Sequence, residues 1–348
     1  MELKEIVSSV PFPDKEIEKL AWAKLDSLTK PPRSLGILEE CAAKYVTARG
    51  DIHASIQKPT VLTFAGDHGV AAEGVSAFPQ EVTPQMVANF ASGGAAINVL
   101  SELEGVAVRI IDIGVAADCP FPGVIQRKVA RGTANMAKGP AMSVEEAEKA
   151  ITIGIEEAWT AIDSGSTLII TGDMGIANTT PSTALYSVLL DIKPRDITGR
   201  GTGINDRGLI RKIITVEESI KINRERLNSP LEIMAALGGF EIAGICGSII
   251  GAAMRKVPVV VDGFISGAAA VCAIKMNRNI APYCFFGHLS ADSGHKKIMS
   301  KLGVKPLLSL DMRLGEGTGA VLAVNIIRAG LAIMNKMATF DEAGISKS

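Results

Sequence analysis

Three glycine-rich segments of this chain carry residues that can bind a phosphate. Residues 172–180 (GDMGIANTT) follow an apolar run, residues 199–203 (GRGTG) follow a polar stretch, and residues 314–319 (LGEGTG) precede a long apolar run. Backbone N–H groups in such loops and at helix starts carry partial positive charge and attract anions. Thr179 and Thr202 add hydroxyl donors, and Lys212 adds a positive charge. Together they predict a phosphorylated ligand, most simply a nucleotide.

Several well-known site motifs are missing from the sequence. It contains no GxxxxGK[ST] loop, and no GxGxxG turn follows its first apolar run, which disfavours P-loop enzymes and nicotinamide dehydrogenases. No GxSxG elbow indicates a Ser-His-Asp hydrolase. His288 and His295 flank Asp292, but their spacing matches no zinc pattern. We therefore predict neither a metal site nor a cofactor, and expect this loop to position a ligand or an interface.

Glu316 stands between two glycines immediately before a long apolar run. A carboxylate at this place can be a cap or a first-turn partner of the following helix. It can also be a general base held in a cleft, where small neighbours leave room for a ligand and burial raises its pKa. The spacing alone leaves both interpretations open.

Short apolar runs alternate with helical segments along most of the chain. The runs lack the polar alternation of half-exposed strands, so they predict an α/β fold with a Rossmann-like, mostly parallel sheet and helices on both faces. The predicted strands are residues 59–65, 106–113, 166–171, 258–262 and 283–286, with a last short strand at 305–307. The predicted helices are residues 15–28, 35–47, 83–91, 94–102, 144–164, 231–237, 241–254, 266–276 and 320–333.

Ligands of parallel sheets bind at the carboxyl ends of the strands. The segments that follow four of the predicted strands are rich in Gly and Asp: AGDHG (65–69), TGDMG (171–175), VDGF (261–264) and FGHLSADSG (286–294). Glycine lets backbone N–H groups approach a ligand, although tight βα turns use the same residues. The recurrence in four segments favours a ligand-binding role over plain turns, and the expected site residues from these segments include Gly263, Phe264 and Ser290.

Composition limits the kinds of partner. The chain has 36 Lys and Arg against 37 Asp and Glu, and aromatic residues make up only 4%, so binding to nucleic acid is not expected. Five scattered cysteines without a CxxC pair are typical of a reducing cytoplasm. The N-terminus lacks the apolar core of a signal peptide, and no apolar run reaches the roughly 20 residues that span a bilayer. We expect a cytoplasmic protein that does not bind membranes.

A series of blocks resembles the nicotinate-nucleotide–dimethylbenzimidazole phosphoribosyltransferases of the cobalamin nucleotide-loop pathway. The blocks are LTKPPRSLGILEE (28–40), FAGDHGV (64–70), VSAFPQEVTPQMVANFASGGAAINVL (75–100), TGDMGIANTT (171–180), GRGTG (199–203), LGGFEIAGICG (237–247), VDGFISGAAA (261–270), GHLSADSGH (287–295) and LDMRLGEGTGA (310–320). They follow one another in the family's order. The resemblance implies transfer of 5-phosphoribose from nicotinate mononucleotide to 5,6-dimethylbenzimidazole or a similar base, giving α-ribazole 5′-phosphate and nicotinate.

The resemblance also implies roles for particular residues. Glu316 matches the family's general base, and Lys212 matches a further family lysine. Phosphate-side contacts fall in the two loops that contain Gly175, Asn178, Thr179, Gly201, Thr202 and Gly203, and Gly315 and Gly317 flank the base. Asp173 stands where many relatives carry Glu, so its role beside the ribose or nicotinate is open. The pocket for the acceptor base falls near Phe78, Gln85 and Met86, which by sequence alone are equally well core or interface residues.

The family further implies a homodimer with a small helical domain built from both chain termini. We assign residues 1–58 and 325–348 to that domain, and residues 59–324 to the large domain that binds nucleotide and base. Two rival functions are a dinucleotide or nucleotide-sugar enzyme on a Rossmann-like sheet, and a sensor that binds the nucleotide or base without turnover. The first would need a ribose-binding acid about 20 residues beyond a GxGxxG turn, and the second would release no nicotinate.

Overall fold

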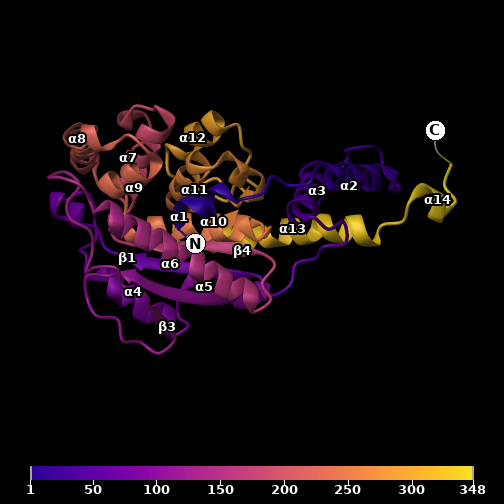
Figure 1. Cartoon of the computed structure of the whole chain (residues 1–348), viewed down its shortest axis with the longest axis horizontal. Helices are drawn as coiled ribbons and strands as arrows, with labels where there is room; N and C mark the ends of the chain where they lie inside the picture. The colour runs from indigo at the N-terminus through magenta and orange to yellow at the C-terminus, as the bar shows by residue number, and fades with distance from the viewer. Residues whose placement is uncertain (1, 347–348) are drawn as a thin grey trace.

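Six parallel strands form a sheet through the centre of the molecule, as seen in a computed structural model that describes residues 2–346 (Figure 1). The strands are β1 (Thr60–Gly66), β2 (Ala107–Gly114), β3 (Val124–Gln126), β4 (Ile169–Met174), β5 (Val259–Val261) and β6 (Cys284–Phe286). Their order is β3-β2-β1-β4-β5-β6. Successive strands are added toward one edge from β1 to β3 and toward the other edge from β4 to β6. α/β sheets bind ligands beside such a switch point, which here lies between β1 and β4.

Side chains on the two faces of the sheet belong to two separate hydrophobic cores. Leu62 and Phe64 of β1 point into one core, and Val61 and Ala65 point into the other, as expected for a strand buried on both sides. The first core is covered by α1 (Leu3–Ser8), α6 (Val144–Asp163), α7 (Thr179–Leu190), α9 (Pro230–Leu237), α10 (Phe240–Met254), α11 (Phe264–Met276) and α12 (His295–Leu302). The second is covered by α2 (Lys15–Ser27), α3 (Ile37–Arg49), α4 (Val82–Ala91), α5 (Ala96–Glu104) and α13 (Thr318–Lys336).

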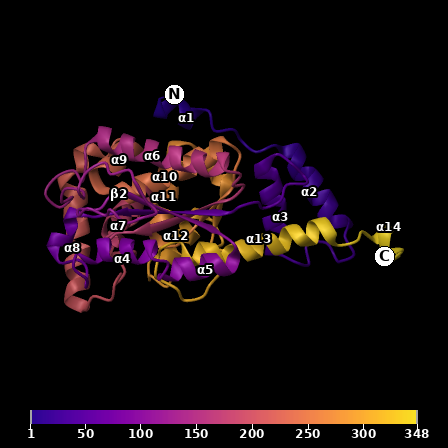
Figure 2. The ribbon, with the colours of Figure 1, turned by 90° about the horizontal axis from the view of Figure 1, so that it is seen from below.

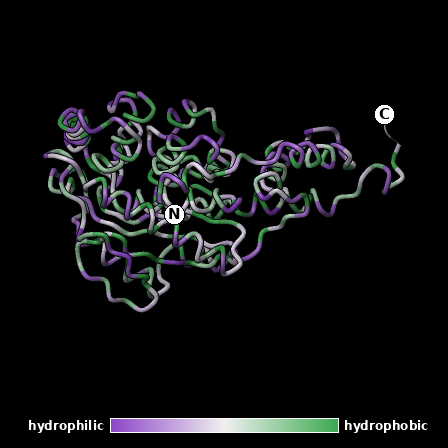
Figure 3. Tube along the Cα trace, in the orientation of Figure 1, coloured by the Kyte–Doolittle hydropathy of each residue, from purple (hydrophilic) through white to green (hydrophobic). Residues whose placement is uncertain are grey.

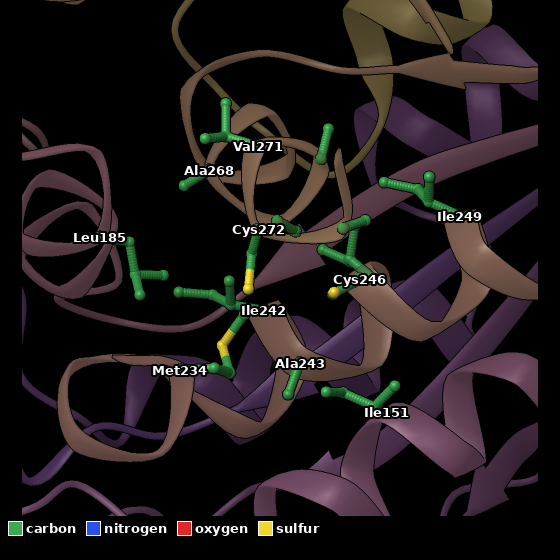
Figure 4. Close-up of a cluster of buried hydrophobic side chains, with 14 of the residues drawn as sticks. Ile151, Leu185, Met234, Ile242, Ala243, Cys246, Ile249, Ala268, Val271 and Cys272 are labelled. Atoms are coloured by element: carbon green, nitrogen blue, oxygen red, sulfur yellow. The ribbon is translucent and has the colours of Figure 1, made fainter. Parts of the chain in front are cut away.

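The first core is filled by aliphatic and sulfur-containing side chains. Figure 4 shows Met234, Ile242, Cys246 and Cys272 pointing into the space between their helices. All five cysteines of the chain are free and buried. Hydrophilic residues lie mainly on the outer helices such as α2, while the central strands are hydrophobic (Figure 3).

Helices α6 and α10 cross in unusually close contact. A Cβ placed on Gly247 of α10 would lie 1.9 Å from the carbonyl oxygen of Ile151, and one on Gly154 of α6 would lie 1.9 Å from that of Gly244. Only glycine fits at these two crossing points, because any side chain would overlap the neighbouring backbone. The contact seats α10 against the sheet, where it packs on β1 and β4.

Helices from the two ends of the chain pack together away from the sheet (Figure 2). The helix α13 begins at the sheet edge and extends outward, where it contacts α3, and α3 contacts α2. A β-bridge also pairs Leu28 with Thr339, just before α14 (Phe340–Ala343). α13 is long and apolar enough to cross a membrane, but 56% of its most apolar window is buried in the structure, so it is a core helix.

The structure confirms the parallel α/β sheet and corrects some of its details. Residues 305–307 form no strand: the Leu307 N–H donates to the Phe286 carbonyl at 2.9 Å, and Leu308, the next residue, makes an isolated bridge with His288. The three-residue edge strand β3 and the helices α1, α7, α12, α14 and α8 (Asp206–Ile222) were not predicted. Several of these are short or uniformly buried, so they carry no clear hydrophobic period.

The α6–α10 contact makes Gly247 a sensitive position. We expect Gly247→Ala to lower the free energy of unfolding by about 1–2 kcal/mol. A Cβ 1.9 Å from a backbone oxygen places the overpacking cost at about 2–3 kcal/mol, and alanine regains roughly 1 kcal/mol of that in a helix. Urea denaturation measures this difference. Gly139→Ala is the control, since a Cβ there meets nothing within 4 Å. Equal stability of Gly247→Ala and the parent chain would contradict the close contact.

Candidate functional site

A cavity of about 300 Å³ lies at the carboxyl ends of β4, β5 and β6. Its walls come from the segments after these strands, from the loop that leads into α4, and from the turn that leads into α13. The lining residues are Val75, Ser76, Phe78, Val82, Met86, Asp173, Met174, Gly175, Ile176, Ala177, Asn178, Thr179, Gly201, Thr202, Asp262, Gly263, Phe264, Ile265, His288, Ser290, Asp292, Arg313, Leu314, Gly315 and Glu316. The rule that places ligands at strand ends therefore holds here.

The turn at 315–317 carries Glu316 into the cavity. Its three residues have φ angles of +87°, +65° and +99°, a left-handed conformation that glycine accepts easily and glutamate does not. The turn is tied to β4, where the Glu316 backbone N–H donates to the Asp173 carbonyl at 3.2 Å. On its other side Thr63 Oγ1 donates to the Glu316 carbonyl at 3.1 Å. These bonds over-determine the position of a strained residue, which is typical of functional sites.

The Glu316 carboxylate lies at the N-terminus of α5, where Oε2 accepts the Ile97 backbone N–H at 3.2 Å. Its side chain is buried, and within residues 2–346 no salt bridge reaches it. Burial raises the pKa of Glu316 above its usual 4.5, the Ile97 N–H opposes this, and the charge of Asp262 adds to it. A buried carboxylate with a raised pKa and a free oxygen toward a cavity can accept a proton from a ligand.

Asp173 and Asp262 place two more buried carboxyl groups beside Glu316. Burial raises the pKa of Asp173 well above its usual value, and the charges of Asp262 and Glu241 raise it further. The hydrogen bond from Asn178 Nδ2 to Asp173 Oδ2, at 3.0 Å, acts against this shift. Such a cluster of carboxyl groups favours a ligand that brings positive charge.

Another part of the cavity wall carries the GRGTG loop, Arg313 and Asp292, with Lys212 behind it. Lys212 of α8 is 1% exposed, and its Nζ donates to Thr179 Oγ1 at 2.6 Å. Burial lowers the pKa of Lys212 to about 8, although the charge of Asp292 opposes the shift. Arg313 lines the cavity and donates from Nη1 to the Gly201 carbonyl at 2.9 Å. This part of the wall is suited to an anionic group such as a phosphate.

An apolar wall closes one side of the cavity. Val75, Phe78, Val82 and Met86 line it, and Phe78 is 53% exposed at the rim. The loop that carries Phe78 is joined to the GRGTG loop, because the Ala77 N–H donates to Thr202 Oγ1 at 2.9 Å. The apolar wall and the GRGTG loop therefore line one cavity.

Most of the site residues expected from the sequence lie together in this cavity. Those that line it are Phe78, Met86, Asp173, Gly175, Asn178, Thr179, Gly201, Thr202, Gly263, Phe264, Ser290, Gly315 and Glu316. Four others do not line it. Lys212 lies behind Thr179, Gly203 lines a neighbouring hollow, Gly317 is the N-cap of α13, and Gln85 is exposed on α4 outside the cavity.

The site residues expected from the sequence leave out five polar residues that line the cavity: Ser76, Asp262, His288, Asp292 and Arg313. Asp262 and His288 directly follow β5 and β6, so the strand-end rule was enough to find them. Arg313 precedes the LGEG turn and carries no motif of its own. His295 instead packs inward, where its Nδ1 accepts the Ser290 N–H at 2.9 Å. Across residues 2–346, no cluster of His, Cys, Asp and Glu is arranged to hold a metal ion.

Comparison with known proteins shows that relatives match nearly the whole chain. A phosphoribosyltransferase family model matches residues 10–345. The nicotinate-nucleotide–dimethylbenzimidazole phosphoribosyltransferase of Chlorobaculum parvum is 56% identical over 344 residues, which cover 99% of this chain and 98% of the relative. The enzyme of the same name from Chlorobaculum tepidum is 54% identical over the same length, with the same coverage of both chains.

The fold agrees as well as the sequence. A crystal structure of nicotinate-nucleotide–dimethylbenzimidazole phosphoribosyltransferase from Thermus thermophilus superposes with a TM-score of 0.90 at 45% identity, over 96% of this chain and 100% of the other. Sequence and fold both agree with those of these relatives over nearly the whole chain. The chain belongs to the nicotinate-nucleotide–dimethylbenzimidazole phosphoribosyltransferase family.

Proposed function

We propose that this chain transfers 5-phosphoribose from nicotinate mononucleotide to 5,6-dimethylbenzimidazole, forming α-ribazole 5′-phosphate and nicotinate for cobalamin synthesis. One observation of the structure supports this most directly. The buried Glu316 carboxylate lies in the same cavity as an apolar wall for a flat ring and a positively charged end for a phosphate.

The reaction breaks one C–N bond and forms another. Nicotinate is attached to C1′ as a pyridinium, so the electrons of the broken bond return to the ring nitrogen and the leaving group needs no proton. One nitrogen of the benzimidazole attacks C1′ from the opposite face, which converts the β configuration to α. The proton on its second nitrogen then passes to the Glu316 carboxylate. A single base is sufficient, and Glu316 fills that role.

The acidic residues of the cavity support the same mechanism. The ribose becomes cationic as the C–N bond breaks, and Asp262 and Glu316 line the part of the cavity where this charge develops, beside Asp173, whose pKa is raised by burial. Fixed carboxylates in a buried site stabilise such charge more strongly than water does. Asp173 serves the ribose or pyridinium side, one methylene shorter than the glutamate of many relatives.

The phosphate is held at the other end of the cavity. Gly175, Asn178 and Thr179 of the β4–α7 segment and Gly201, Thr202 and Gly203 of the GRGTG loop supply donors, and Lys212 supplies charge from behind. Gly263, Phe264 and Ser290 complete this wall around the ribose. Holding the phosphate fixes both rings against C1′, which turns a two-substrate reaction into a nearly intramolecular one.

The acceptor base binds against Phe78 and Met86, with Gly315 and Gly317 giving the Glu316 turn its shape. The Gln85 side chain is exposed outside the cavity, so α4 would have to move for this residue to reach the base. We further propose a homodimer in the cytoplasm, with residues 1–58 and 325–348 forming its small helical domain. Packing of α2 and α3 with α13 supports that division, whereas α1 contacts α10 on the large body.

Turnover is tested by following nicotinate. We expect nicotinate and α-ribazole 5′-phosphate to appear in equal amounts, and only when enzyme, nicotinate mononucleotide and dimethylbenzimidazole are all present. Chromatography of the mixture measures both products, and omission of the base is the control. A sensor would be stabilised by the two ligands without releasing nicotinate, and that result would refute the transferase.

Glu316→Gln tests the general base. Glutamine keeps the shape and can still accept the Ile97 N–H, so we expect kcat to fall about 10²–10⁴-fold while the chain still binds nicotinate mononucleotide. Because burial raises the pKa of Glu316 above 4.5, activity of the parent chain should decline as pH falls through that raised value. A pH profile of kcat measures this. If the variant kept the parent kcat, Glu316 would not be the base.

Lys212→Met tests the phosphate end. We expect a KM for nicotinate mononucleotide raised at least about tenfold, since a charge-assisted hydrogen bond contributes about 1.5–3 kcal/mol. The pKa of Lys212 is about 8, so its charge is lost as pH rises through 8 and the parent KM should rise there too. Lys221→Met, at an exposed position of the same helix, is the matched control. An unchanged KM for Lys212→Met would remove Lys212 from phosphate binding.

A further inference from the structure

Asp262 is a buried carboxylate that the mechanism above uses only as part of a negative environment. It directly follows β5, is 1% exposed, and lines the cavity together with Asp173 and Glu316. Its position is well fixed by the backbone, because the Asp262 N–H donates to Thr171 Oγ1 at 3.1 Å. The side chain is therefore held in place before any ligand arrives.

The two oxygens of Asp262 have different surroundings. Oδ1 accepts the Ala320 backbone N–H at 2.9 Å, at the N-terminus of α13, and lies 3.5 Å from Nε2 of His288. Oδ2 is buried and has no hydrogen-bond partner within residues 2–346. Leaving a buried charged acceptor unpaired is costly, by more than the roughly 1–3 kcal/mol of a neutral group. An unpaired acceptor in a cavity wall points to a ligand that donates a hydrogen bond.

The two substrates offer few hydrogen-bond donors. The benzimidazole carries one N–H, which the proposed mechanism gives to Glu316. The phosphate and the carboxylate of the donor are acceptors, so the 2′- and 3′-hydroxyls of its ribose are the remaining donors. We propose, building on the proposed function, that Asp262 Oδ2 accepts a hydrogen bond from a ribose hydroxyl of the phosphoribosyl donor and so orients its C1′ toward the acceptor base.

The neighbouring carboxyl groups are less suited to this contact. Asp173 Oδ2 already accepts from Asn178, and burial favours the protonated form of this residue. Glu316 Oε2 accepts from Ile97, and its second oxygen is needed for the proton. Asp262 is held at the N-terminus of a 19-residue helix, where a negative charge is favoured. It combines a fixed position with an unpaired oxygen, whereas Asp292, another lining residue with an unpaired oxygen, packs against Gly199 near Lys212.

Removing the acceptor and the donor separately tests the contact. Asp262→Asn keeps the shape and the bond from Ala320, but replaces Oδ2 by an NH₂ group that cannot accept a hydroxyl hydrogen. Each protein is assayed with nicotinate mononucleotide and with its 2′-deoxy and 3′-deoxy analogues. Both kcat/KM and the dissociation constant of the donor without base, measured by calorimetry, are recorded. Thermal unfolding checks that the variant is folded.

In the parent chain we expect one deoxy analogue to react about 10- to 100-fold less efficiently than the normal donor. In Asp262→Asn the normal donor should lose a similar factor, and the difference between normal and deoxy donors should shrink to less than about threefold. Asp67→Asn is the matched control. Asp67 also follows a strand, is buried, accepts one backbone N–H from Ala116 and has an unpaired Oδ1 within residues 2–346, but it does not line the cavity.

The control should discriminate between the donors as the parent chain does. The proposal is overturned if Asp262→Asn keeps the parent's discrimination, or if the parent chain treats both deoxy analogues like the normal donor. The dissociation constants of the three donors, measured by calorimetry, distinguish a failure of this proposal from a failure of the proposed transferase activity. A parent chain that releases no nicotinate but loses affinity for one deoxy analogue, in a manner that depends on Asp262, would refute the turnover and still support the contact.

Discussion

The contact between the turn at 315–317 and the end of β4 determines the shape of the whole site. A Cβ at Gly172 would lie 2.3 Å from the Glu316 carbonyl oxygen, so strand and turn touch only because that position has no side chain. The same contact brings Asp173 beside Gly315 and directs α13 outward from the sheet edge. One close approach of backbones thus fixes Glu316, the proposed general base, together with its acidic neighbour and the start of α13.

Helix N-termini accommodate the acidic end of the cavity. Glu316 accepts from the first turn of α5, and Asp262 accepts from the first turn of α13. Within residues 2–346, no lysine or arginine forms an ion pair with Asp173, Asp262 or Glu316. Backbone N–H groups stabilise a carboxylate without neutralising its charge. This environment suits the cationic sugar of the proposed reaction, while Lys212 contacts Thr179 and Arg313 contacts Gly201 in the loops proposed for the phosphate.

Much of this arrangement follows from the sequence by physical rules. Apolar runs such as 166–171 mark buried parallel strands, and the Gly-Asp segments after them identify the edge where ligands bind. The function of Glu316 rested on resemblance, because a carboxylate before a helix is also an ordinary cap. In the structure the Glu316 carboxylate does accept a hydrogen bond at the N-terminus of a helix. This helix is α5 and not α13, which Glu316 precedes.

Other features depend on three-dimensional proximity that no local pattern encodes. Arg313 enters the site because it reaches the carbonyl of Gly201, more than a hundred residues earlier in the chain. Gln85 looked equivalent to Met86 in sequence, yet the helical turn points one outward and the other into the cavity. The uniformly buried helix α7 gave no amphipathic signal, since nearly all of its residues face neighbours.

The left-handed backbone of Glu316 has a consequence for how this protein responds to selection. A glutamate at φ +65° costs about 1 kcal/mol that a glycine would not. The hydrogen bond from the Ile97 N–H offsets part of this cost, so selection for heat resistance alone gives little reason to keep the carboxylate that the proposed reaction needs. Any engineering of this scaffold for durability has to hold that codon constant and seek its gains on the outer helices.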